Sequence, residues 1–254
     1  MNRQFIINFH GIGQPARPLE AGEERYWISV DAFERILDYI VDQDGETRAN
    51  ISITFDDGNI SDFLIALPRL LNRKLTARFF IVAGRLELPN FLSSSEATEL
   101  RRAGMTVGAH GFAHLDWRRA SDDELEREIR GARDMIAEAV HEPIDEVAIP
   151  YGSYDRRVLR WLKRAGYKAI YTSDGGACLP HFRLKPRNCL RRDMDPSDIE
   201  RILRSANLIT DTLQGARLLL KQRRRPPFAA LRTSTSTPRK SLVPEGDQIA
   251  GRRG

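Results

Sequence analysis

Residues 51–58 read Ile-Ser-Ile-Thr-Phe-Asp-Asp-Gly, a short apolar run that ends in two adjacent carboxylates and a glycine. The β-branched and aromatic residues of 51–55 predict a strand, and Asp56, Asp57 and Gly58 mark its end. Two neighbouring carboxylates at a strand end point in different directions, so one can bind a metal ion while the other accepts a proton. The same three residues also suit an ordinary turn or a helix cap, so this segment alone leaves both interpretations open.

Similar apolar runs recur along the chain and alternate with helical patterns. We expect strands at 4–9, 51–55, 78–82, 106–109, 146–149 and 168–172, and a further strand at 187–190. We expect helices at 30–41, 60–73, 95–103, 122–140 and 155–165. Ser121 and Glu124 form a capping-box pattern at the start of the fourth helix. This alternation predicts an α/β fold with a mainly parallel sheet, and about seven strands favour a (β/α) barrel over an open sheet.

Polar residues follow several of the expected strands, where chemistry is expected in α/β folds. His10 follows the first strand, His110-Gly-Phe-Ala-His114 follows the fourth, and Pro150-Tyr-Gly152 follows the fifth. Histidines four residues apart can reach one metal ion, although an isolated pair is also common on protein surfaces. With Asp57 they make an Asp-His-His set that leaves coordination positions open for water and substrate, as a hydrolytic metal site requires.

Taken together, Thr54-Phe-Asp-Asp-Gly58, His110-Gly-Phe-Ala-His114 and Pro150-Tyr-Gly152 resemble, in order and spacing, the motifs of the polysaccharide deacetylase family, also called the NodB-homology group. The resemblance covers about residues 5 to 200. It implies a distorted (β/α) barrel that removes acetyl groups from an N-acetylated sugar, or less often from an O-acetyl ester, with the help of a metal ion.

The resemblance also implies roles for individual residues. By position, Asp57, His110 and His114 resemble the family's metal ligands, and Asp56 resembles the general base that takes a proton from the attacking water. Tyr151 resembles the residue whose backbone N–H stabilises the tetrahedral oxyanion. The Asp-His-His set suits Zn²⁺, and Co²⁺, Ni²⁺ or Mn²⁺ could use the same ligands.

The chain departs from the family pattern in two places. The late histidine motif that supplies the general acid in many members is absent, since residues 208–212 hold no histidine. His10 is our candidate for the acid because it resembles an early histidine of the biofilm-polysaccharide deacetylases, with His181 in reserve. Many members carry an arginine before the position of Pro150, where this chain has Ile149, and Arg187 could supply that charge instead. These departures favour a role in bacterial exopolysaccharide or glycolipid biosynthesis.

Charge divides the 254-residue chain unevenly. Residues 217–254 hold ten Lys or Arg and two acidic residues, so the net charge of +5 leaves −3 for residues 1–216. We expect a catalytic domain at 1–221 and a basic, disordered tail at 222–254, preceded by a helical pattern over 196–222. A helix that ends in basic residues could touch an anionic membrane surface. The charge pattern gives little support to nucleic-acid binding.

Two further features bear on the cellular setting. The longest apolar runs are far too short to span a bilayer, and the start of the chain lacks the pattern of a secretory signal, so we expect a cytoplasmic protein. Cys178 and Cys189 are expected to be reduced thiols. The expected partner is an N-acetylated saccharide substrate. Two alternatives stay open: an amidohydrolase that acts on a small non-sugar amide or cyclic imide, and a non-catalytic glycan-binding barrel.

Overall fold

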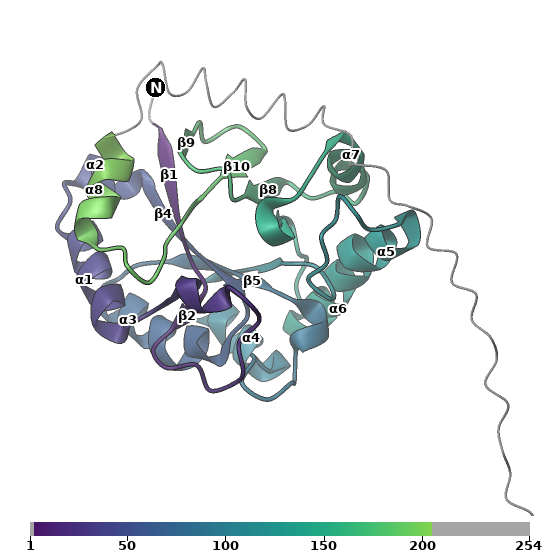
Figure 1. Cartoon of the computed structure of the whole chain (residues 1–254), viewed down its shortest axis with the longest axis horizontal. Helices are drawn as coiled ribbons and strands as arrows, with labels where there is room; N and C mark the ends of the chain where they lie inside the picture. The colour runs from purple at the N-terminus through teal and green to yellow at the C-terminus, as the bar shows by residue number, and fades with distance from the viewer. Residues whose placement is uncertain (1–2, 205–254) are drawn as a thin grey trace, which may run out of the picture.

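A curved sheet of parallel strands runs through the middle of the molecule, and helices lie along its outer side (Figure 1). The structure is a computed structural model that describes residues 3–204. Its strands are β1 (Gln4–Phe9), β2 (Gly11–Ile12), β3 (Trp27–Ile28), β4 (Ile51–Asp57), β5 (Ala77–Ile81), β6 (Thr106–Ala109), β7 (Glu146–Ala148), β8 (Ala169–Thr172), β9 (Ala177–Cys178), β10 (Leu184–Pro186) and β11 (Asn188–Cys189).

The α-helices are α1 (Val30–Val41), α2 (Gly45–Ala49), α3 (Leu67–Asn72), α4 (Ser94–Arg102), α5 (Asp122–Glu126), α6 (Ala132–Val140), α7 (Arg156–Arg164) and α8 (Pro196–Arg204). Short 3₁₀ turns are η1 (Glu23–Tyr26), η3 (Ala83–Arg85) and η5 (Pro150–Gly152). Two π-helical turns, η2 (Asp62–Ala66) and η4 (Arg127–Gly131), interrupt the helices expected at 60–73 and 122–140. In each turn a backbone N–H bonds the carbonyl five residues back, so one extra residue enters the helix.

The main sheet closes on itself through one short segment of chain. Its strand order is β10-β8-β7-β6-β5-β4-β1-β11, and every neighbouring pair in that order is parallel. The two end strands, β10 and β11, are separated in the chain by Arg187 alone. Arg187 N–H donates to Thr172 O of β8, and three residues later Leu190 N–H donates to Asn8 O of β1. Residues 184–189 therefore act as a kinked seventh strand, and the predicted distorted barrel is confirmed.

Alternate residues of the strands face the interior of the barrel and the surrounding helices. Ile6, Phe80, Ala148 and Tyr171 form a small apolar cluster, whereas their chain neighbours belong to the larger core beneath the helices. In that larger core the ring of Phe55 stacks on Phe9 and Phe79 at centroid distances of 5.3 and 4.7 Å, and Phe33 of α1 packs edge-on against Phe9. This burial holds α1 against β1 and β4 and so fixes the strand ends that carry the site.

Most of the expected elements lie where the sequence predicts them. The helix at 30–41 has the predicted bounds, and the capping box of Ser121 and Glu124 is present. The helix expected at 155–165 is Arg156–Arg164, because the Asp155 side chain caps it by accepting from two backbone N–H groups. Of the helix expected over 196–222, residues Pro196–Arg204 form α8 and the rest lies outside the described residues, as does the boundary expected at 221.

Sequence analysis missed the shortest elements, namely β2, β3, β9, β10 and α2. A strand of two or three residues has no period to detect, and its existence depends on the neighbour that it pairs with. Cys178 and Cys189 are free, as expected.

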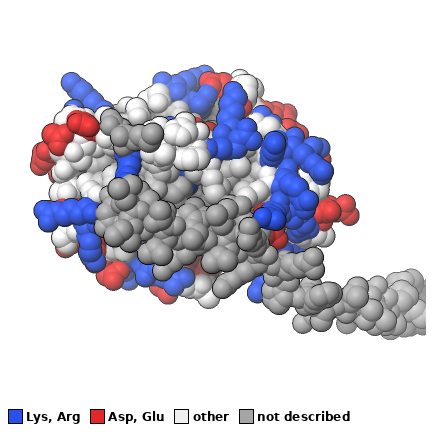
Figure 2. Space-filling model, turned by 90° about the horizontal axis from the view of Figure 1, so that it is seen from above, with Lys and Arg blue, Asp and Glu red and all other residues white. Residues whose placement is uncertain are grey.

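Basic side chains gather most densely on the right of Figure 2, the side on which Figure 1 places α7. Five of the nine residues of α7 are Lys or Arg. Within residues 3–204 we find no helix with the length and apolar character needed to cross a membrane.

Candidate active site

The polar residues singled out in the sequence meet at the carboxyl ends of the barrel strands. Six of the seven line one cavity of about 280 Å³: His10 after β1, Asp56 and Asp57 at the end of β4, His110 and His114 after β6, and Tyr151 after β7. The seventh, Arg187, is fully buried beneath them, where the barrel closes. Parallel strands share one carboxyl end, which is why residues more than 100 positions apart in the chain come together here.

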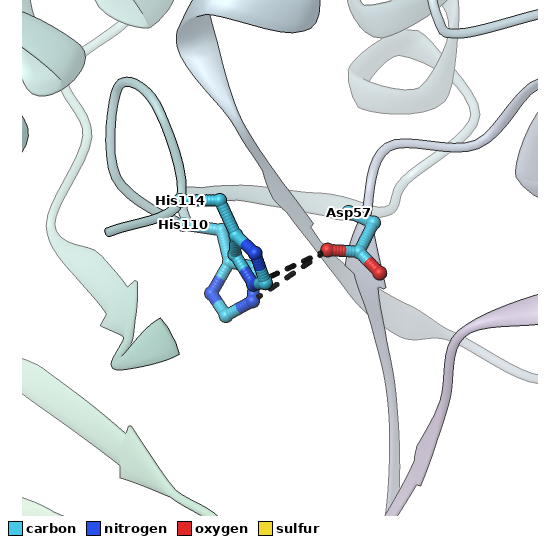
Figure 3. Close-up of side chains that lie close together, drawn as sticks. All are labelled: Asp57, His110 and His114. Atoms are coloured by element: carbon cyan, nitrogen blue, oxygen red, sulfur yellow. Dashed lines mark ion pairs between the residues drawn. The ribbon is translucent and has the colours of Figure 1, made fainter. Parts of the chain in front are cut away.

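Asp57, His110 and His114 form the group best suited to hold a metal ion. One carboxylate oxygen of Asp57, Oδ1, lies 3.9 Å from Nε2 of His110 and 3.5 Å from Nε2 of His114 (Figure 3). One ligand atom from each of the three residues lies within 4.8 Å of the others. An ion placed among these atoms would be held by one oxygen and two nitrogens, a donor set typical of hydrolytic zinc sites.

Both imidazoles are prepared to act as neutral ligands. Nδ1 of His110 lies 2.9 Å from Ala148 O, and donation of its proton to this carbonyl leaves the Nε2 lone pair directed at Asp57. Burial lowers the pKa of His110 to about 4 despite the opposing effect of Asp56, and it lowers the pKa of His114 as well. Neutral imidazoles beside a buried carboxylate fit a divalent cation, because the ion supplies the charge that the cluster lacks.

Asp56 is held by the buried guanidinium of Arg187, 131 positions later in the chain. Arg187 Nη1 and Nη2 donate to Asp56 Oδ1 and Oδ2 at 2.6 and 2.8 Å, and Arg187 Nη1 also donates to Asn8 Oδ1. The amide of Asn8 in turn donates to Asp56 Oδ2 at 3.0 Å. Burial alone would raise the pKa of Asp56, but Arg187, aided by His110, outweighs it and holds that pKa well below its usual range. Asp56 is therefore a carboxylate, able to accept a proton and not to donate one.

His10 lines the cavity beside Asp56. Its Nε2 is 3.8 Å from Asp56 Oδ2, and its ring stacks on Tyr26 with the centroids 4.7 Å apart. Its Nδ1 is buried and has no hydrogen-bond partner among the described residues. His10 thus lines the cavity with Nε2 close to the Asp56 carboxylate.

Tyr151 stands at the mouth of the cavity. Its side chain is 61% exposed, and its ring centroid lies 4.5 Å from that of His114. The backbone at Tyr151 is left-handed, with φ 56° and ψ 6°, inside the turn that follows β7.

Left-handed backbone is concentrated at this site. Of the seven non-glycine residues with positive φ in the described part of the chain, Asp57, His114 and Tyr151 all belong to it. Such conformations cost free energy and persist only where surrounding contacts impose them, which is a recognised property of functional sites. The surrounding fold therefore holds Asp57, His114 and Tyr151 in backbone conformations that these residues would not adopt by themselves.

Sequence analysis missed three side chains around the site. Arg85 lies beyond the end of β5, with Nη1 3.5 Å from Asp57 Oδ1 and Nη2 2.8 Å from Glu20 Oε1. The rule that polar residues follow strands could have found it. Asn8 could have been noticed as a polar residue inside an apolar strand. Asp62 is fully buried, and burial together with Asp57 and Asp56 raises its pKa well above the usual range.

The structure places the reserve histidine elsewhere. His181 is exposed, follows β9, and stacks on Phe182 with a centroid distance of 4.7 Å. Because β9 pairs with β1 at Gln4 and Phe5, His181 lies toward the opposite end of β1 from His10. It does not line the cavity, so His10 is the candidate acid that the fold brings to the site.

Comparison with known proteins agrees with this geometry. A family profile described as "Polysaccharide deacetylase" matches residues 43–170, half of the chain. YxkH of Bacillus subtilis (strain 168) is 22% identical over 127 residues, which are 50% of this chain and 46% of that protein. The matched region thus spans less than half of the length of this curated relative.

Solved structures share the fold over a larger part of the chain. The Streptococcus pyogenes deacetylase PplD, solved in complex with acetate, superposes with a TM-score of 0.68 at 21% identity, covering 79% of this chain and 98% of that chain. A de-N-acetylase from Aggregatibacter actinomycetemcomitans superposes with a TM-score of 0.66 at 12% identity, covering 79% and 99%. At these identities the likeness establishes the fold.

Proposed function

Because this chain belongs to the polysaccharide deacetylase family, we propose that it is a metal-dependent hydrolase that removes acetyl groups from an N-acetylated carbohydrate. The observation that carries the proposal is the placement of Asp57, His110 and His114 in the same cavity as the Asp56–Arg187 pair. The N-acetyl group is preferred to an O-acetyl ester because one protein of the same fold is described as a de-N-acetylase.

The metal site would be formed by Asp57 Oδ1 and the Nε2 atoms of His110 and His114. A bound dication, for which we propose Zn²⁺, supplies Lewis-acid polarisation of the acetyl carbonyl and makes a nearby water more acidic. The anchoring of His110 to Ala148 O fixes one ring in the orientation needed for binding.

Asp56 is our proposed general base. Its carboxylate, kept ionised by Arg187, accepts a proton from the water that attacks the acetyl carbon. Asn8 and Arg187 occupy both carboxylate oxygens and so fix the direction in which the carboxylate faces. Arg187 is a positioning residue in this scheme, since it acts through Asp56.

His10 is our proposed general acid. When the carbon–nitrogen bond breaks, the leaving sugar amine needs a proton, and Nε2 of His10 would donate it. This nitrogen lies 3.8 Å from Asp56 Oδ2 and both residues line the cavity, which supports a role for both in the same reaction. Stacking on Tyr26 keeps the imidazole over the cavity.

The backbone N–H of Tyr151 is our proposed oxyanion donor. Tyr151 has a left-handed backbone in the turn that follows β7, and it lines the cavity with its ring against His114. A fixed backbone donor at the developing oxyanion typically contributes about 10²–10³-fold in rate.

Acetate release provides the test. The protein is loaded with zinc and incubated with N-acetylhexosamine oligomers, and released acetate is measured for the wild type and for Asp56→Asn. We expect release by the wild type and a loss of about 10²-fold or more in the variant, with zinc content unchanged. Absence of acetate from every acetylated saccharide at full zinc occupancy would contradict the proposal and favour the small-amide or glycan-binding alternative.

The biological substrate is a further part of the proposal. We propose an acetylated bacterial exopolysaccharide, or a glycolipid precursor of one, as the molecule acted on. The departures at Ile149 and in residues 208–212 support this choice, because they set the chain apart from the common family pattern. Product analysis with lipid-linked and free oligosaccharides of the same sugar would separate the two sources.

A further inference from the structure

Glu128 is a buried carboxylate that no role in the proposed reaction explains. Only 2% of its surface is exposed, and it lies in η4, the π-helical turn between α5 and α6. Its carboxylate accepts three hydrogen bonds from the segment that follows β6. The donors are Ala113 N–H to Oε1 at 2.6 Å, Leu115 N–H to Oε2 at 3.3 Å and the Trp117 indole N–H to Oε2 at 3.0 Å.

The two backbone donors flank one proposed metal ligand. Ala113 and Leu115 are the residues before and after His114, and each donates to a different oxygen of Glu128. His114 itself has φ 57°, a left-handed conformation that is unfavourable for a residue with a Cβ atom. The carboxylate therefore links the backbone N–H groups of the residues before and after a strained residue, which fixes the position from which the imidazole extends toward Asp57.

Two local features allow the carboxylate to reach this position. In η4 the N–H of Ala132 bonds Arg127 O, five residues back, so an extra residue enters the helix at Glu128. On the other side, Gly111 leaves space: a Cβ atom there would lie 2.5 Å from Glu128 Oε2. The helical irregularity and the glycine thus suit the same contact, although they come from different parts of the chain.

We propose that Glu128 is a positioning residue that sets the geometry of His114 and thereby the affinity of the metal site. This inference rests on the proposed function, because it takes His114 as a metal ligand. Glu128 does not touch the cavity, so its effect passes through the backbone of 113–115. A residue that orients a ligand in this way typically changes metal affinity by about 10–100-fold when it is replaced.

The first test measures zinc affinity by competition with a chelator of known affinity. Glu128→Gln keeps the size of the side chain but replaces one acceptor oxygen with a donor that faces a backbone N–H. We expect its zinc dissociation constant to rise by about 10–100-fold. Ile136→Val, a change of a buried residue on α6, is the control for general destabilisation and should retain wild-type affinity. Wild-type affinity in Glu128→Gln would overturn the inference.

A second variant separates the bonds that flank His114 from the third one. Trp117→Phe removes only the indole donor and leaves the bonds of Ala113 and Leu115 in place. We expect this variant to be less stable than the wild type yet to bind zinc with wild-type affinity. If Trp117→Phe weakened zinc binding as much as Glu128→Gln, the effect would be one of loop stability, and the assigned role would be wrong.

Amide hydrogen exchange tests the same contact without metal. In the metal-free protein we expect the N–H groups of Ala113 and Leu115 to exchange at least about tenfold faster in Glu128→Gln than in the wild type. Unchanged exchange at both positions would refute the contact itself. If the wild type bound no zinc but showed protected amides, the result would count against the proposed function alone. If the wild type and Glu128→Gln bound zinc with equal affinity, the result would count against the role of Glu128 alone.

Discussion

Replacement of Arg187 by methionine tests the electrostatic arrangement beneath the site. Arg187 is fully buried, and it donates two hydrogen bonds to Asp56, one to Asn8 and one to Thr172 O. Methionine fills much of the same space but leaves the carboxylate of Asp56 buried without its cation. Removal of one partner of a buried ion pair typically costs about 3–5 kcal/mol, a large part of the 5–15 kcal/mol by which domains are stable.

The double variant shows whether the isolated charge is the cause. Asp56→Asn removes the charge that Arg187 balances, so in the Arg187→Met background it should cost little or restore stability. We therefore expect the combined loss to fall short of the sum of the two single losses by about 1–3 kcal/mol. The assay is urea denaturation followed by circular dichroism, with all four proteins at the same pH. Strictly additive losses would refute the reasoning.

The pH dependence of the same variants gives a second criterion. In the wild type the folded protein lowers the pKa of Asp56. The ionised Asp56 therefore contributes its full stabilisation at any pH above the ordinary pKa of an aspartate, and this stabilisation is lost as the pH falls below that ordinary pKa. Without Arg187, burial should raise this pKa above its ordinary value, and the variant should regain stability as pH falls through the raised pKa. The difference between wild type and Arg187→Met is then largest at neutral pH and narrows on acidification. A difference that does not change with pH would contradict the assigned cause.

Three further predictions concern the chemistry. His10→Gln should lower kcat by about 10²–10⁴-fold without loss of zinc, and steady-state kinetics with metal analysis will show whether acid catalysis and metal binding separate in this way. Tyr151→Gly keeps the backbone N–H and accepts φ 56° without strain, so we expect kcat to stay within about tenfold of the wild type. A drop in kcat of about 10²-fold or more would show that the phenol ring, and not the backbone N–H, is what the reaction needs from this residue. Removal of metal by a chelator should abolish acetate release and lower the melting temperature, and zinc at 100 times its Kd should restore both, adding about 2.7 kcal/mol of stability. Full activity after complete removal of metal would exclude the metal-dependent reaction.

Several elements of the fold follow from local sequence alone. The helix at 30–41 has the predicted bounds because its apolar residues repeat with a helical period over one buried face. The strands at 4–9 and 106–109 have the predicted bounds because each contains a short run of consecutive buried residues, as is typical of strands covered on both faces. The two-residue strands and the π-helical turns were missed. A π-helical turn depends on contacts at one point of a helix, such as those of Glu128, and leaves no periodic signal in the sequence.

Part of the candidate site was predictable from the positions of polar residues relative to the strands. Asp56 and Asp57 end β4, and His110 follows β6 directly, with His114 four residues later. Because the carboxyl ends of parallel strands meet, the sequence itself determined that these side chains converge. Only the tertiary structure decided how they are held. Arg187 pairs with Asp56 across 131 positions because the barrel closes at that residue, and Glu128 reaches the backbone on both sides of His114 because the helix gains a residue there. Such contacts depend on strand order, register and helix packing, and sequence spacing does not encode these.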